Sequence, residues 1–348
     1  MKKQQTLAVQ LHHFHNINSS EYSGDYNRLQ RFWSGESLLF VEYGVRIGKK
    51  VSLSVGPGVS SLLYHVDGEK LQHNILPRLH FKGTYQPADN QFLYFSYSIG
   101  NNTPVYSTLN SADQVIDSVR ILRGNPNQTV AKLYTGVLNY SLQLGKVNIS
   151  MTGAHIYGKD MFASYYYVEG DKMISSFRDD TNCHEVDAIL GVNWKVIPSL
   201  HLKAEGTYVY LKYNGGVHRS HNVWMGSLQA NYYWKSLGVS AFFNTPVDMI
   251  DLSWIHTKSP VAYGISANWS YGNLWVEVGT TSPFSKNLEK KQYLNSDPFY
   301  TFNKVQRDRT FQQWGWVKVA YTFDFGRKTS RSQNNVNTEI NSAILKTN

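Results

Sequence analysis

The stretches LHLKAEGTYVY (residues 200–210) and WMGSLQANYYW (residues 224–234) decide the fold of this chain. In both, apolar or aromatic residues alternate with polar ones, and a period of two predicts a β-strand. Each strand then has one apolar face and one water-facing face. The apolar positions are Leu200, Leu202, Ala204, Tyr208, Tyr210, Trp224, Leu228, Ala230, Tyr232 and Trp234.

The composition fits strands that face lipid on one side and water on the other. Aromatic residues make up 14% of the chain, whereas the mean hydropathy is −0.40. Membrane β-barrels combine aromatic girdles with a polar interior in this way. No run reaches the roughly 18 to 20 consecutive apolar residues that a membrane-spanning helix needs. Any crossing of a membrane is therefore expected to use strands.

The connections between strands are predicted to come in two lengths, as in outer-membrane barrels. Tight turns are predicted at 48–50, 87–90, 145–146, 197–199, 235–237 and 271–273. The alternate connections are longer and rich in Gly, Asn, Ser and Asp, at 16–34, 101–130, 159–183, 246–259 and 284–309.

These patterns together predict an all-β chain that forms an antiparallel transmembrane β-barrel of about 14 strands. The strands are expected to start near residues 4, 35, 50, 70, 91, 131, 146, 184, 199, 221, 237, 260, 273 and 311.

Charge and cysteine content exclude several other classes of protein. The net charge is +9, but the basic residues are scattered among turns and the tail, without the basic stripe and exposed aromatics of a nucleic-acid-binding protein. The single cysteine, Cys183, excludes a disulfide framework within the chain and a multi-cysteine metal site. No nucleic-acid partner is expected.

The first residues, MKKQQTLAVQLHHFH (1–15), alternate in hydropathy and predict a strand. A secretory signal would need a continuous apolar segment here. Because an outer-membrane protein must be exported, we expect the chain to be a piece of a longer one or to have lost its start.

Four segments resemble the outer-membrane β-barrel family found at the C-terminal end of Bacteroidetes TonB-dependent receptors. RGNPNQTV departs from that family's pattern at Gln128, where leucine is usual, and at Val130, where proline is usual. WVKVAYTFDFGRK resembles the terminal strand, whose aromatic residues are read by the barrel-assembly machinery. The segments are LPRLHFKGTYQPADNQFLYFSYS (76–98), RGNPNQTV (123–130), WVKVAYTFDFGRK (316–328) and INSAILK (340–346).

The resemblance implies active import of a scarce ligand across the cell outer membrane, powered by TonB acting on a plug inside a barrel of about 22 strands. This chain has no segment that resembles the plug, and it is short of that barrel by roughly eight strands. The domains expected are a barrel portion at 1–326 and a C-terminal polar extension at 327–348. Expected partners are outer-membrane lipid, the barrel-assembly machinery and a surface lipoprotein, with plug and TonB only if the chain belongs to a longer one.

No catalytic, cofactor-binding or metal-binding residue is predicted, and the chain is not expected to be an enzyme. HEVDA (184–188) has Ala188 where a zinc-protease motif has its second histidine. GVRIGKK (44–50) is too short for a phosphate-binding loop and ends in Lys50 instead of Ser or Thr. His13 and His15 share one face of a strand, but a place on the rim or in the lumen explains them better than a metal does.

Charged residues on the polar faces have two interpretations. They either pair with one another across a wet lumen, or they contact a plug or select ions. They are Glu42, Arg46, Arg78, Lys82, Lys203, Glu205, Glu277, Lys318 and Asp324.

Aromatic residues of the long loops are the candidate ligand contacts, because their rings could stack on a ligand. Ordinary packing in the loops or girdle explains them equally well. The candidates are Tyr165, Tyr166, Trp254, Tyr293 and Tyr300, with Tyr167 and Phe299 beside them.

Three functions remain open on this sequence. The leading hypothesis is the C-terminal barrel portion of a TonB-dependent receptor that takes part in ligand uptake and is not transport-competent alone. The rivals are a self-contained passive pore of 14 strands and a structural or adhesive surface barrel.

Overall fold

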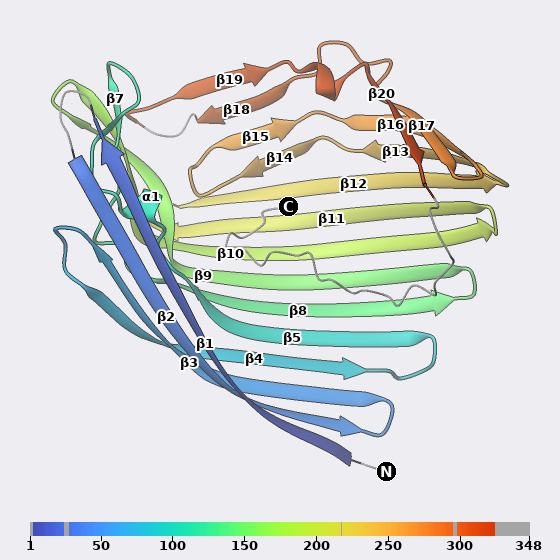
Figure 1. Ribbon diagram of the computed structural model, residues 1–348, viewed down its shortest axis with the longest axis horizontal. Helices are drawn as coiled ribbons and strands as arrows, with labels where there is room; N and C mark the ends of the chain where they lie inside the picture. Colours follow the sequence, from blue (N-terminus) through green and yellow to red (C-terminus); the bar gives the residue numbers. More distant parts are fainter. Residues whose placement is uncertain (1–2, 24–27, 217, 295–297, 324–348) are drawn as a thin grey trace.

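A computed structural model describes residues 3–23, 28–216, 218–294 and 298–323 of the chain. About three quarters of these residues lie in β-strands (Figure 1). Among them, no helix is long and apolar enough to cross a membrane. The predicted boundary between 326 and 327, the polar extension 327–348 and Asp324 lie outside the described residues.

Fourteen of the strands form one curved wall in which each strand pairs antiparallel with the next one along the chain. Tight turns lie at one end of the wall and long connections at the other, as Figure 1 shows. The strands are β1 (Lys3–Tyr22), β2 (Arg28–Ile47), β3 (Val51–Val66), β4 (Gln72–Tyr85), β5 (Gln91–Asn102), β8 (Ala131–Leu144), β9 (Val147–Glu169), β10 (Lys172–Ile197), β11 (Leu200–Gly215), β12 (Arg219–Trp234), β13 (Leu237–Asn244), β16 (Ala262–Tyr271), β17 (Leu274–Thr281) and β20 (Trp314–Tyr321).

The predicted fold class is confirmed, because every predicted strand has its counterpart in the wall and all six tight turns join neighbouring strands. Gly48, Gly145 and Gly272 have positive φ angles at three of the turns. Glycine adopts that backbone conformation without steric cost, which explains these positions.

The two faces of the wall differ as the alternation predicts. Outward side chains remain exposed, for example Trp224 at 72% and Leu228 at 57%. On the inner face, Arg78 Nη2 lies 2.6 Å from Glu36 Oε1 and Lys82 Nζ lies 3.2 Å from Glu42 Oε1.

Mutual ion pairing therefore accounts for much of the lumen charge. Lys318 Nζ lies 3.2 Å from Glu277 Oε1, and Lys203 Nζ lies 3.6 Å from Glu205 Oε2. Arg78, Lys82, Lys203 and Lys318 thus each have a carboxylate on the same face of the wall, as the first of the two interpretations requires.

The wall has two free edges within the part of the chain that the structure describes. There, β1 pairs with β2 alone and β20 pairs with β17 alone. A strand edge with unpaired backbone groups cannot face lipid without a large energetic cost. Both edges therefore need partners if the wall spans a membrane.

Strand ladders extend into two of the long connections, where loops were predicted. The β1–β2 ladder continues to the pair Tyr22 and Arg28, and the β9–β10 ladder continues to Glu169 and Lys172. Backbone hydrogen bonds hold these ladders together, and such bonds form whether or not apolar and polar side chains alternate. The sequence pattern therefore did not reveal these parts of the strands.

A second, smaller sheet forms from the connections after β13 and β17. Its order is β14 (Val247–Ile250), β15 (His256–Ser259), β18 (Lys290–Leu294) and β19 (Phe302–Gln306). The short 3-10 helix η1 (Arg309–Phe311) then leads into β20.

The connection between β5 and β8 bridges distant strands of the wall. It holds α1 (Tyr106–Leu109), β6 (Gln114–Val115) and β7 (Arg120–Leu122). Leu109 packs into a buried cluster with Phe32 and Leu62 of β2 and β3, whereas β7 pairs in parallel with β10. The segment therefore joins both parts of the wall at its long-loop end.

Candidate functional site

The second sheet packs against the inner face of the wall at the long-loop end. Val209, Leu211 and Val223 are buried there, and they alternate with outward residues such as Trp224. Ile250 of β14 and Leu294 of β18 complete the apolar cluster. The long loops and the wall thus form one packed unit.

Three of the predicted ligand-contact residues come together at this cluster. The ring centroids of Tyr166 and Tyr300 are 5.3 Å apart, and both rings pack against the cluster that contains Trp254. Trp254 is only 2% exposed, and its Nε1 donates a hydrogen bond to the backbone oxygen of Ser164 at 2.7 Å. In this conformation Trp254 supports the loops and offers no free ring face.

The other two predicted contacts lie apart from that group. Tyr165 stacks on Tyr167, with the ring centroids 5.4 Å apart. The guanidinium of Arg178 lies 5.9 Å from the centroid of the Tyr165 ring. Tyr293 stacks on His256 at 4.8 Å. Ligand contact by these five aromatic residues stays a prediction.

Two arginines of the segment between β5 and β8 (residues 103–130, the bridging segment) also connect the long loops. Arg120 Nη1 donates to the hydroxyl of Tyr300 at 2.9 Å. Arg123 lies between the carboxylates of Asp113, at 2.5 Å, and Glu169, at 2.8 Å. Hydrogen bonds to these two carboxylates raise the pKa of Arg123.

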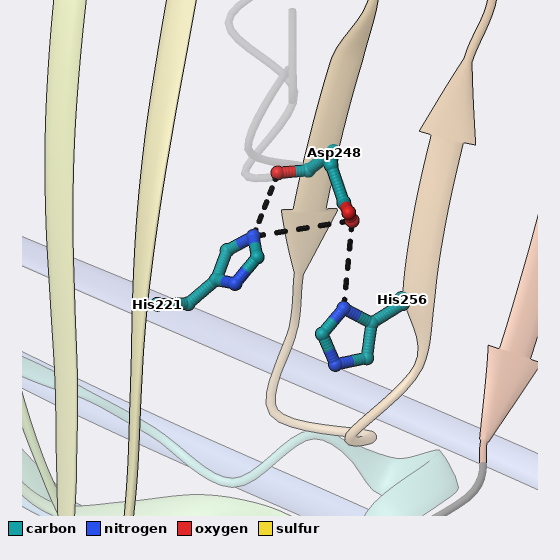
Figure 2. Close-up of side chains that lie close together, drawn as sticks. All are labelled: His221, Asp248 and His256. Atoms are coloured by element: carbon teal, nitrogen blue, oxygen red, sulfur yellow. Dashed lines mark hydrogen bonds and ion pairs between the residues drawn. The ribbon is translucent and has the colours of Figure 1, made fainter.

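One group of side chains in the described part of the chain has the chemistry of a metal site. Figure 2 shows His221 of β12, Asp248 of β14 and His256 of β15 pointing toward one another. Each offers one ligand atom, and these atoms all lie within 4.8 Å of one another. The side chains are partly buried, with exposed fractions of 19%, 34% and 25%.

A single oxygen, Asp248 Oδ1, lies between the two imidazoles. It is 3.4 Å from His256 Nδ1 and 3.9 Å from His221 Nε2. His221 Nε2 also donates to the backbone oxygen of Asp248 at 2.8 Å, as Figure 2 shows. The second carboxylate oxygen, Oδ2, lies 3.2 Å from Lys258 Nζ.

Sequence patterns do not reveal this group of side chains, because its members are far apart in the chain and match no short motif. One signal was available, since the alternation of β12 places His221 on the inner face with Val223. The approach of Asp248 and His256 depends on how the second sheet packs, which local patterns do not reveal.

The histidines that were considered in the sequence have ordinary neighbours. His13 Nδ1 lies 2.9 Å from Ser37 Oγ, and the ring of His13 stacks on that of His15. His184 stacks on Tyr157 with 4.5 Å between the ring centroids. The register of β1 with β2 places His13 and His15 on the same face as Leu11, which is 74% exposed.

Two apolar hollows, of about 480 and 710 Å³, lie on the outward face of the wall. Their lining includes Trp194, Leu228, Leu190 and Trp224. These side chains belong to the lipid-facing stripe, so the hollows are grooves for lipid and are not lumen sites.

Comparisons with solved structures decide the kind of wall that this chain forms. The copper transporter OprC matches 92% of the chain with a TM-score of 0.70 and 13% identity. The iron transporter FrpB of Neisseria meningitidis, in its F5-1 variant, matches 92% with a TM-score of 0.65 and 13% identity. The ferric yersiniabactin uptake receptor FyuA of Yersinia pestis matches 92% with a TM-score of 0.59 and 10% identity.

This chain has the receptor-barrel fold. It spans about half the length of these structures, at 54%, 53% and 51% of each. No family model and no curated protein matches the sequence.

The receptor-barrel fold supports the resemblance to TonB-dependent receptors at the level of fold. The Bacteroidetes type of receptor stays a prediction. Because receptor barrels are outer-membrane structures, the predicted location in the cell outer membrane agrees with the fold.

Proposed function

We propose that this chain is an outer-membrane receptor barrel, or the C-terminal portion of one, that takes part in ligand uptake. The observation that carries the proposal is the two-faced wall of fourteen strands, which aligns over 92% of the chain with transporters and an uptake receptor. The outward face suits lipid, and the inner face carries paired charges.

The long-loop end is the recognition surface in this proposal. Outer-membrane barrels place long loops outside the cell and short turns in the periplasm. The second sheet, the bridging segment 103–130 and the aromatic candidates all lie at the long-loop end. Ligand recognition therefore falls to these segments, with a surface lipoprotein as a further partner.

The two free edges support a barrel that needs additional strands. If β1 and β20 are to meet lipid safely, their unpaired backbone groups require further strands or each other. In a receptor, a longer chain would supply the remaining strands and the plug on which TonB acts. Lipid and the barrel-assembly machinery are then the partners of the wall itself.

The rival function is a self-contained passive pore. In such a pore β1 and β20 would have to pair with each other, because both edges are free in the described part of the chain. A surface barrel with an adhesive role would share the outer-membrane location but would take up no ligand.

A blot of isolated outer membranes tests these functions. Boiled and unboiled samples are run side by side and probed with an antibody raised against residues 103–119. A boiled band much larger than the calculated 39.8 kDa is expected for a receptor with further strands and a plug. A boiled band at 39.8 kDa that migrates differently when unboiled would overturn the fragment and support the closed pore. A chain found only in the soluble fraction would overturn the outer-membrane proposal.

A further inference from the structure

We propose that His221, Asp248 and His256 bind one divalent first-row transition metal ion, and that the ion fastens the β14–β15 hairpin to the wall. The three donors come from two sheets, since His221 belongs to the wall strand β12 and the other two belong to the second sheet. The site is independent of the proposed uptake function.

The donor set selects the class of ion. Two imidazole nitrogens and one carboxylate oxygen suit zinc, copper, iron and nickel, whereas calcium and magnesium prefer ligands that are all oxygen. Three protein ligands that leave one position open to water or another ligand are a usual zinc arrangement.

One pair of donors, His256 Nδ1 and Asp248 Oδ1, already has the spacing of two ligands of one metal ion. Nitrogen and oxygen ligands about 2.0 to 2.2 Å from zinc in tetrahedral geometry lie about 3.3 to 3.5 Å from each other. His256 Nδ1 is 3.4 Å from Asp248 Oδ1, and His221 Nε2 is 3.9 Å from the same oxygen. Good hydrogen bonds between these atoms would measure about 2.7 to 3.2 Å. To bind the ion, His221 Nε2 must release its 2.8 Å hydrogen bond to the Asp248 backbone oxygen and lose its proton.

Neighbouring side chains already orient two of the donors. The ring of Tyr293 stacks on His256, with an angle of 7° between the planes. Lys258 Nζ contacts Asp248 Oδ2 at 3.2 Å and leaves Oδ1 to face the imidazoles. Outer contacts of this kind fix ligand orientation in metal sites. The positive charge of Lys258 also repels a cation, so it lowers the affinity of the site for the metal ion.

The location gives the metal a structural consequence. His221 belongs to the wall, while β14 and β15 pair only with each other and with β18 in the part of the chain that the structure describes. A bound ion adds a bond between the hairpin and β12 beside the apolar cluster. Metal binding should then slow opening of the hairpin, because an ion that binds only the closed state stabilises it.

The test uses the protein extracted from outer membranes in detergent, stripped with a chelator and then titrated with Zn²⁺ by calorimetry. One ion per chain is expected. His256→Gln and Asp248→Asn should each weaken binding by at least about 10-fold. His184→Gln is the matched control, since His184 lies on the outer face of the wall in a stacking contact with Tyr157, and it should bind like the unaltered protein.

Two further measurements test the proposal even if a variant of a metal-binding residue folds poorly. Lys258→Gln keeps all three donors, keeps a side chain that can donate a hydrogen bond to Asp248 Oδ2 and removes the opposing positive charge. It should therefore tighten Zn²⁺ binding several-fold. Zn²⁺ should also slow proteolysis between β14 and β15 in the unaltered protein but not in Asp248→Asn. Absence of stoichiometric Zn²⁺, Cu²⁺ and Ni²⁺ binding, or binding unchanged in both ligand variants, would overturn the site. Neither result would alter the heat-dependent migration that tests the receptor barrel.

Discussion

Trp254 is a loop residue that occupies the position of a core residue. Its side chain is 2% exposed, its ring meets Tyr213 edge-on at 5.3 Å, and the guanidinium of Arg219 lies 4.9 Å from the ring. Trp254→Ala should destabilise the second sheet by about 3 to 5 kcal/mol, the usual cost of removing a buried aromatic side chain. Hydrogen exchange of the β14 and β15 amides would measure this loss.

The variant Trp254→Phe separates packing from hydrogen bonding at this position. It keeps an aromatic ring but loses the bond to the Ser164 oxygen, so its loss should be clearly smaller than that of the alanine variant. If the β14 amides are equally protected from hydrogen exchange in both variants and in the unaltered protein, a structural role for Trp254 is contradicted.

Glu289 gives the second sheet a dependence on pH. Its carboxylate lies 2.5 Å from Arg307 Nη2 and 3.2 Å from Lys291 Nζ, and the hydrogen bond from Arg307, followed by that from Lys291, lowers the pKa of Glu289. A carboxyl whose pKa is lower in the folded state stabilises that state above its ordinary pKa. The contribution is lost as the pH falls through the lowered value.

Protection of the β18 and β19 amides should therefore decrease below a pH of about 4 in the unaltered protein. Glu289→Gln should start with lower protection at pH 7 and lose less on acidification. Parallel pH profiles for the two proteins would contradict this role of Glu289.

At the level of elements, the wall was predictable because its signals are local. Alternation in β11 and β12 and glycine turns such as Gly145 and Gly272 are each contained within a few residues. The strands β14, β15, β18 and β19 have only four or five residues each, so no alternation could distinguish them from a loop. Asp248 and His256 lie in two of these short strands, so local patterns could not place them. They come close to His221 only because the two sheets pack together.

The orientation of β12 leads to a matched pair of substitutions. Leu228 lies on the outward face near the middle of the apolar stripe, and Gln229 lies on the inner face. Leu228→Arg should cost about 2 to 4 kcal/mol in a bilayer, because a charge there faces lipid. Gln229→Arg should cost far less, because its charge reaches the wet face.

Denaturant titration of the protein in lipid vesicles would measure both changes. Similar losses for Leu228→Arg and Gln229→Arg would contradict the assignment of lipid-facing and inner faces. The loss should also shrink in detergent micelles, where the apolar layer adapts more readily.

For the whole molecule, local patterns could predict the number of wall strands but not how the wall closes. The partner of β1 or β20 depends on strands distant in sequence or outside these residues. The bridging segment was likewise predicted as a loop, because its contacts with β2, β3 and β10 depend on the curvature of the wall.

The orientation of the molecule can be tested on intact cells with a membrane-impermeant maleimide. In a Cys183→Ser background, Asp171→Cys at the tip of the β9–β10 hairpin should be labelled, since the Asp171 side chain is 85% exposed. Asn273→Cys, at a tight turn, should be labelled only after the outer membrane is permeabilised. The reverse pattern would mean that the long loops face the periplasm.

The parallel pairing of β7 with β10 also fixes an order of events during folding. Arg120 of β7 pairs with Met173, so β7 cannot take its place on the wall until β10 has formed. Contacts between residues so far apart in sequence form late, because the chain between them must first be ordered. Until then Ile121 and Leu122 of β7 lack their partners Ile174 and Ser175 of β10. A chain that stalls before β10 therefore carries an unpaired strand edge through which it can aggregate.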